Sequence, residues 1–160
     1  KQLYNMAIAS LQAERQLKQP TLLEQAKEAS LIDISLPDIK GKQQKLSDLK
    51  GKVVLLDFTA YQTDYSPEYN ILLAKIYKQF RDKGFEIYQV SLDNNENFWK
   101  VSASNLPWIC VRDEASIYST VANLYNVKNL PSAFLIDRTG AIQKRIASIE
   151  SISGEIQKLL

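Results

Sequence analysis

The chain has 160 residues, of which 45% are hydrophobic and 24% are charged, and its formal net charge is +2. These values are typical of one soluble globular domain with a core of ordinary size. Because 20 basic residues are spread along the chain and are nearly balanced by 18 acidic ones, we expect neither a nucleic acid nor an anionic membrane surface as partner.

Two scarce residue types restrict the chemistry. The sequence contains no histidine and a single cysteine, Cys110. Histidine is the commonest general base and metal ligand, and a zinc cluster, a dithiol or an intrachain disulfide needs a second cysteine. We therefore predict no metal site and no cofactor. No apolar run reaches the roughly 18–20 residues that a membrane helix needs, so we expect membrane attachment only through an anchor that would precede Lys1.

Residues 1–30 are predicted to form a helical leader or linker that precedes the main domain, residues 31–160. In residues 1–19 the helical spacing of apolar side chains defines one face, made of Leu3, Tyr4, Ala7, Ile8 and Leu11. Pro20 interrupts this helix, and residues 22–29 are predicted to form a second short helix.

The main domain begins with an extended segment at residues 31–36, followed by turns. Apolar runs predict strands at residues 53–58, 85–92, 108–111, 132–137 and 141–147. Helical spacing predicts helices at residues 67–83, 94–104, 117–125 and 149–160. The apolar stripe of the first of these contains Tyr69, Leu72, Leu73, Ile76, Tyr77 and Phe80, and that of the third contains Ile117, Val121, Leu124 and Tyr125. Helices that alternate with strands, before a final hairpin, indicate an α/β fold with a mixed sheet covered on both faces.

Several blocks of the sequence resemble one family. They are residues 41–42 with 46–58, 83–87, 90–93, 121–127 and 130–137. Together they resemble the TlpA/ResA-like thiol–disulfide oxidoreductases, which belong to the alkyl hydroperoxide reductase/thiol-specific antioxidant (AhpC/TSA) group of the thioredoxin superfamily. The resemblance runs from about residue 31 to the C-terminus. It implies a thioredoxin-like fold with an N-terminal helical extension, and in such relatives a further N-terminal domain often comes first.

The resemblance also implies the site. Pro131, after Leu130, matches the family's cis-proline, which sits opposite the dithiol and helps to hold an extended peptide. Asp57 matches the acid buried beneath the dithiol; without a thiol to serve, it is expected to be a hydrogen-bonded core carboxylate with a raised pKa. Where the family has Cys-x-x-Cys, this chain has Thr63-Asp64-Tyr65-Ser66.

Hydroxyl groups cannot replace the missing sulfur. Dithiol exchange needs a thiolate nucleophile and a second sulfur that resolves the mixed disulfide. Thr63-x-x-Ser66 also echoes the Thr-x-x-Cys motif of peroxiredoxins, but again without the sulfur. A hydrolytic serine needs a base, and the chain has no histidine. We therefore predict that Ser66 caps a helix whose first position is Pro67.

Three other side chains are candidates for function. Tyr61 and Tyr65 are expected to be exposed binding residues, together with Leu130 and Pro131, whereas Tyr69 belongs to the core. Cys110 lies in an apolar strand, which favours a small buried hydrophobe over a reactive thiol or an intermolecular disulfide.

The residues support two functional interpretations. The first is a protein without dithiol catalysis that binds an extended peptide or another protein at loop 59–66 and Pro131. The alternative is an oxidoreductase or antioxidant protein that uses Cys110 or a cysteine of its partner. The resemblance implies a periplasmic or otherwise extracytoplasmic location in a bacterium, with a membrane tether in the full-length protein.

Overall fold

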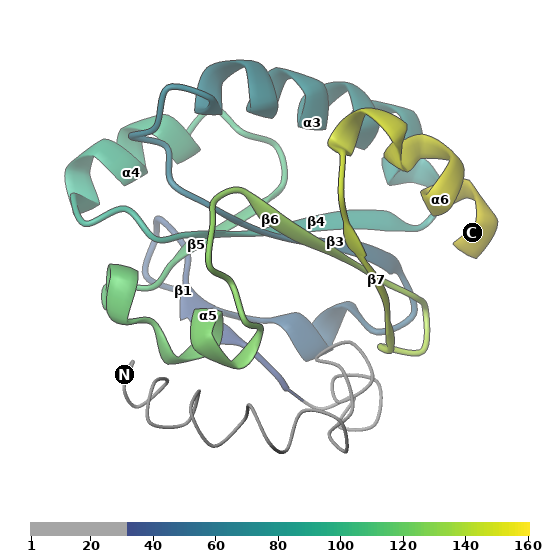
Figure 1. Ribbon diagram of the computed structural model, residues 1–160, viewed down its shortest axis with the longest axis horizontal. Coiled ribbons are helices and arrows are strands. Elements are labelled where there is room, and N and C mark those ends of the chain that lie inside the picture. Colours follow the sequence, from purple (N-terminus) through teal and green to yellow (C-terminus); the bar gives the residue numbers. More distant parts are fainter. Residues whose placement is uncertain (1–31) are drawn as a thin grey trace, which may run out of the picture.

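A mixed five-stranded sheet lies at the centre of the computed structural model, which describes residues 32–160 (Figure 1). Its strand order is β5-β4-β3-β6-β7. The strands β3 (Val53–Thr59), β4 (Phe85–Ser91) and β5 (Ile109–Arg112) are parallel, whereas β6 (Ser132–Ile136) and β7 (Ile142–Ile146) form an antiparallel hairpin. The predicted α/β class and mixed sheet are confirmed, while the predicted leader lies outside the described residues.

Helices cover one face of the sheet. They are α3 (Ser66–Phe80), α4 (Glu96–Ala103) and α6 (Ile152–Leu159), and they lie above the sheet in Figure 1. The short 3-10 helices η2 (Arg81–Lys83) and η4 (Ile149–Ser151) extend α3 and introduce α6.

The other face has a lighter cover. Within residues 32–160 it consists of the short helix α5 (Thr120–Leu124) and of an antiparallel ribbon formed by β1 (Ser35–Pro37) and β2 (Gln43–Lys45). A 3-10 helix, η1 (Leu46–Leu49), follows β2, and another, η3 (Ser116–Tyr118), precedes α5. Beyond β5, Asp38 forms an isolated antiparallel bridge with Val111.

The core has two halves because β3 is buried along its whole length. Successive side chains of a strand point to opposite faces. Val53 and Leu55 accordingly pack under the α3 side, whereas Val54, Leu56 and Phe58 pack on the α5 side. A strand that is covered on both faces has a continuous apolar sequence, and this pattern predicted β3.

The predicted stripe of α3 is confirmed in the second half of the helix, whereas Tyr69 and Leu72 are half-buried. Leu73, Ile76, Tyr77 and Phe80 are buried against the sheet. The chain leaves η2 through Gly84, whose φ of 96° lies in the left-handed region that glycine adopts without steric cost.

The predicted stripe in residues 117–125 is wrong at two positions. Ile117 is 81% exposed and Leu124 is 51% exposed, whereas Tyr125 is buried. The two positions differ from the prediction because a new helix begins inside the segment. The Ser119 hydroxyl accepts a hydrogen bond from the Ala122 amide at 3.0 Å and so caps the start of α5. Ile117 therefore belongs to η3, so the two residues do not share the face of one helix.

The polar strand β2 carries no apolar alternation and was not predicted.

Within residues 32–160, no helix is both long and apolar enough to span a bilayer.

Candidate functional site

The predicted site residues meet at the carboxyl end of β3. In the sheet register Phe58 faces Ser132, so Thr59 and Pro131 are the next residues of the two paired strands. The Leu130–Pro131 peptide bond is cis. Pro131 is exposed and Leu130 is half-buried, so both side chains reach the surface beside loop 59–66.

Backbone and side-chain hydrogen bonds fold the loop between β3 and α3 into tight turns. The Thr63 hydroxyl donates to the Ala60 carbonyl at 2.7 Å, and the Ser66 amide donates to the Thr63 carbonyl at 3.2 Å. The Thr63 hydroxyl therefore stabilises the turn.

The prediction that Ser66 caps α3 is wrong. The cap residue is Tyr65, Ser66 is the first helical residue, and Pro67 follows it in the first turn. Tyr65 already has helical φ and ψ angles, because the preceding turn leads directly into the helix. The Ser66 hydroxyl accepts a weak hydrogen bond from Asn70 Nδ2 at 3.4 Å.

Tyr65 is half-buried and turns back towards the sheet. Its hydroxyl lies 2.9 Å from Thr59 Oγ1 and accepts a hydrogen bond from the Ala60 amide at 3.3 Å. Its ring packs edge-on against Tyr69, with 5.7 Å between the ring centroids. Tyr65 therefore offers part of its ring to the surface while its hydroxyl is bound within the loop.

Tyr61 is buried, so its predicted exposure is wrong. Only 5% of the residue is exposed, and its hydroxyl donates to Gln89 Oε1 at 2.6 Å. The inward turn is fixed by the buried carboxylate of Asp93, which accepts hydrogen bonds from the amides of Tyr61 at 2.8 Å and Gln62 at 2.9 Å.

Beneath the loop lies a largely buried polar cluster that we call the Gln89 network: Asp57, Tyr61, Tyr69, Asn70, Gln89, Trp108 and Cys110. Gln89 is paired with Asp57 on the neighbouring strand, and its Nε2 donates to Asp57 Oδ2 at 2.9 Å. Tyr69 donates to the other carboxylate oxygen. The amide oxygen of Gln89 accepts from Tyr61 and from Trp108 Nε1, the latter at 2.9 Å.

Burial controls the protonation of this network. It raises the pKa of Asp57 to about 6, although the hydrogen bonds from Tyr69 and Gln89 act in the opposite direction. Burial also raises the pKa of Tyr69 and of Tyr61 far above the usual tyrosine range. The network therefore has one group, Asp57, that exchanges a proton near neutral pH.

Cys110 belongs to the same network, although the sequence places it far from the loop. Its strand partner is Gln89, and its sulfur lies 3.9 Å from Gln89 Oε1. Burial raises the pKa of this thiol to about 12, so it is protonated at neutral pH. A protonated, buried thiol is a poor nucleophile.

Sequence reasoning did not identify Gln89, Asn70 or Asp93. For Gln89 the signal was available, since a lone amide in the middle of a predicted buried strand needs buried hydrogen-bond partners. For Asp93 the sequence shows only an acid after a strand. Its role as acceptor for the amides of Tyr61 and Gln62 depends on the path of the loop that follows β3.

Comparisons with known proteins agree on one family. The AhpC/TSA family model matches residues 28–145. The thiol-disulfide oxidoreductase ResA of Bacillus cereus is 30% identical over 129 residues, which cover 76% of this chain and 72% of that protein. ResA of Bacillus subtilis is 34% identical over 113 residues, and the match spans 60% of its length.

A solved structure extends the agreement to the fold. The solution structure of a thioredoxin-like protein from Bacteroides vulgatus has a TM-score of 0.76 at 51% identity, covering 82% of this chain and 86% of that one. The chain therefore has a thioredoxin-like fold and belongs to the AhpC/TSA family, within its TlpA/ResA-like group of thiol-disulfide oxidoreductase relatives.

Proposed function

We propose that this protein is a thioredoxin-fold binding module that holds an extended peptide or another protein at loop 59–66 and Pro131, without dithiol exchange. The observation that carries the proposal is the state of its single cysteine. Cys110 is 6% exposed and its pKa is raised, while the loop has Thr63 and the buried Ser66 at the positions where the family has sulfur.

Dithiol exchange requires two sulfur atoms that can reach each other. One sulfur attacks as a thiolate and the second resolves the mixed disulfide. Thr63 Oγ1 and Ser66 Oγ form no disulfide, and both are engaged in local hydrogen bonds.

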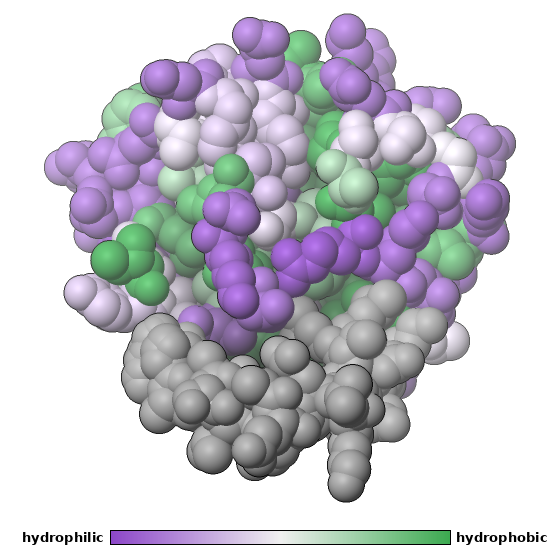
Figure 2. Space-filling view, viewed as in Figure 1, coloured by the Kyte–Doolittle hydropathy of each residue, from purple (hydrophilic) through white to green (hydrophobic). Residues whose placement is uncertain are grey.

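The surface around the loop suits binding. Ile117 is 81% exposed and Tyr118 is 80% exposed. The Ser116 hydroxyl donates to the Leu92 carbonyl at 2.6 Å, which holds η3 at the same end of the sheet as the loop. Figure 2 shows an apolar patch over the η3–α5 segment. Exposed aromatic and aliphatic side chains beside a preorganised loop are typical of interaction sites.

The catalytic part of the proposal is tested by reduction of insulin with dithiothreitol as electron donor. We expect the rate with the protein to equal the rate with reductant alone. A protein-dependent acceleration, abolished in Cys110→Ser, would overturn the proposal.

The binding part is tested by titrating an array of extended decapeptides against the protein and two variants. We expect Tyr118→Asp to lose the binding that the unchanged protein shows. Val101→Asp is the matched control, because Val101 is 69% exposed on α4, outside both η3 and loop 59–66, and its substitution makes the same change in charge. Equal loss in both variants, or no peptide bound at all, would contradict a peptide site here.

A second candidate function is a redox role for Cys110 or for a cysteine of the partner. It is favoured by one contact, the 3.9 Å approach of the Cys110 sulfur to the Gln89 network that contains Asp57. A redox thiol must become a thiolate, and burial opposes this by raising the pKa to about 12. We expect iodoacetamide at pH 8 to leave the folded protein unmodified and to label it completely in urea. Rapid labelling of the folded protein would favour the redox role.

We also propose an extracytoplasmic location in a bacterium, with a membrane tether in the full-length protein. The support is the similarity to the ResA proteins of Bacillus. Fractionation of cells that express the full-length protein should place it outside the cytoplasm, and recovery from the cytosol would contradict the proposal.

A further inference from the structure

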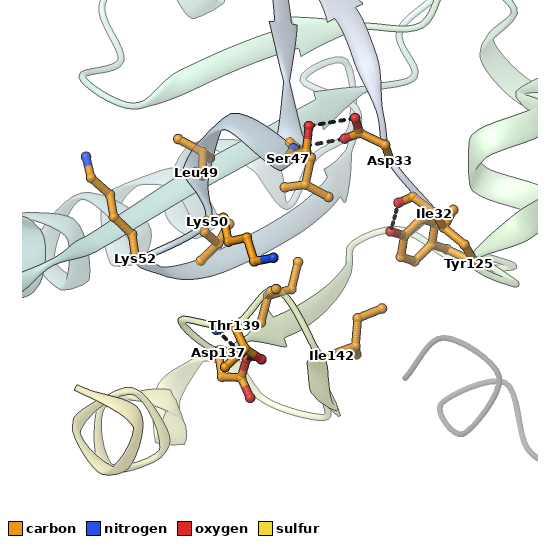
Figure 3. A pocket seen from close by; sticks show the side chains of 14 residues that line it. Ile32, Asp33, Ser47, Leu49, Lys50, Lys52, Tyr125, Asp137, Thr139 and Ile142 are labelled. Carbon is orange, nitrogen blue, oxygen red and sulfur yellow. Dashed lines mark hydrogen bonds between the residues drawn. The ribbon is translucent and has the colours of Figure 1, made fainter. Parts of the chain in front are cut away.

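An apolar groove of about 390 Å³ lies on the sheet face opposite α3 (Figure 3). Its apolar lining comprises Ile32, Leu46, Leu49, Val54, Ile136 and Ile142. One wall is η1 and the other is the β6–β7 hairpin, with Thr139 at its turn. This groove is separate from loop 59–66, so its occupant is independent of the proposed function.

Ile32, the first described residue, lines this groove. The Ile32 carbonyl accepts a hydrogen bond from the Tyr125 hydroxyl at 2.7 Å. The carboxylate of Asp33 accepts from the Ser47 amide at 2.9 Å and from the Ser47 hydroxyl at 2.7 Å. These bonds fix the point from which residues 1–31 extend, and they fix it at the rim of the groove.

In the sequence immediately before that point, apolar residues recur at helical spacing. They have the spacing i, i+1, i+4, i+7 and are Leu22, Leu23, Ala26 and Ala29. A helix of this length is only marginally stable in water unless its apolar face is packed. The link to Ile32 consists of Ser30 and Leu31, so Ala29 cannot lie more than about 11 Å from Ile32.

We propose that residues 22–29 form a helix whose Leu22 and Leu23 side chains fill this groove. The short link holds the apolar face near the groove at a high effective concentration, so binding within one chain competes strongly with any free partner. The lightly covered face of the sheet would thereby gain a second helix beside α5.

Methyl NMR spectroscopy of the full chain tests this packing directly. We expect nuclear Overhauser effects between the methyl groups of Leu22 or Leu23 and those of Val54 or Ile142. Absence of these effects would overturn the proposal.

Two charge-matched variants add a second readout. Leu22→Lys places a charge on the apolar face, and we expect the methyl signals of Ile136 and Ile142 to shift. Glu28→Gln changes the net charge by the same amount on the opposite face of the segment, and we expect those signals to stay in place. Equal shifts in both variants, or in neither, would contradict the proposal.

Other occupants of the groove would give different results. Shifts of the Ile142 signal that depend on protein concentration would indicate a second copy of the chain. A shift that appears after unfolding and refolding, together with release of an apolar compound, would indicate a bound small molecule. Either result would replace the helix as the occupant.

Discussion

Asp57 is a carboxylate held at the centre of a sheet, with no exposed surface. Its oxygens have two donors, Tyr69 and Gln89, which satisfy it without a positively charged partner. Removing a carboxylate from water disfavours its charged form unless the site compensates fully, and here the raised pKa shows that compensation is incomplete.

This raised pKa predicts a specific pH dependence of stability. The pKa of Asp57 is about 6 in the folded protein and the ordinary value is 3.8, so between these values the folded state binds more protons than the unfolded state. The free energy of unfolding therefore falls as pH rises from about 4 to about 6, by an amount on the order of 3 kcal/mol. Above about pH 6 this loss is complete.

Urea unfolding from pH 4 to pH 8 measures this effect when the protein is compared with Asp57→Asn. Asparagine does not ionise, so we expect the difference in stability between the two proteins to change by about 3 kcal/mol across this range. A difference that stays constant with pH would show that Asp57 does not titrate there.

At the scale of elements, loop 59–66 is held from below by Asp93. This residue is 1% exposed and accepts hydrogen bonds from two loop amides and from the Ser91 hydroxyl. A buried amide that loses its acceptor retains the full cost of desolvation.

We expect Asp93→Ala to lower the free energy of unfolding by about 2 kcal/mol. We also expect amide hydrogen exchange at Tyr61 and Gln62 to become faster. Asp64→Ala is the control, since Asp64 is an exposed acid of the same loop. If both variants exchange alike, Asp93 does not organise the loop.

The turn from α3 into β4 depends on Gly84. A Cβ atom at this position would lie 2.8 Å from the guanidinium of Arg138, and the φ angle of 96° is unfavourable for any other residue. Arg138 has little freedom to move because it donates to the carbonyls of Gly51 at 2.8 Å and Lys83 at 3.1 Å.

We therefore expect Gly84→Ala to destabilise the protein by about 1–2 kcal/mol. Gly154→Ala is the matched control, because Gly154 lies inside α6 and a Cβ there would meet no atom within 4 Å. That control should stabilise the protein by up to about 1 kcal/mol. Thermal unfolding distinguishes the two changes by the opposite signs of their effects on Tm.

Sequence patterns predicted the elements far better than the site. The continuous apolar run of β3 and the regular stripe of α3 depend on local order along the chain, and both are confirmed. The orientation of Tyr61 depends on Asp93, a residue far away in sequence, and no local pattern contains that information. The cap of α3 was misplaced by one residue because turn geometry before Ser66, rather than its hydroxyl, starts the helix.

At the scale of the molecule, the two halves of the core share the same strands. Ile156 of α6 is fully buried on one face, and Ile34 is 1% exposed on the other. Because the sheet separates these two residues, they share no packing partner, yet each depends on the same β3 and β4.

Ile156→Val and Ile34→Val should each lower the free energy of unfolding by about 0.5–1.5 kcal/mol. In the double variant the two losses should add to within about 0.5 kcal/mol, with one cooperative transition in urea. A second transition in the double variant would show that the two faces unfold separately.

Each edge of the five-stranded sheet carries a feature that disfavours pairing with another strand. Asp38 bridges to Val111 along the outer side of β5. At the opposite edge, β7 carries Lys144, paired with Glu155 at 3.4 Å, and Arg145, which donates to the carbonyls of Tyr125 and Asn126. Blocked or charged edge strands resist the addition of a foreign strand, which is the route to edge-to-edge aggregation. If the proposed peptide partner binds, the bridge beside β5 and the charged side chains of β7 disfavour strand addition at the two edges of this sheet, and they favour recognition across the ends of the strands, where Pro131 and the loop lie.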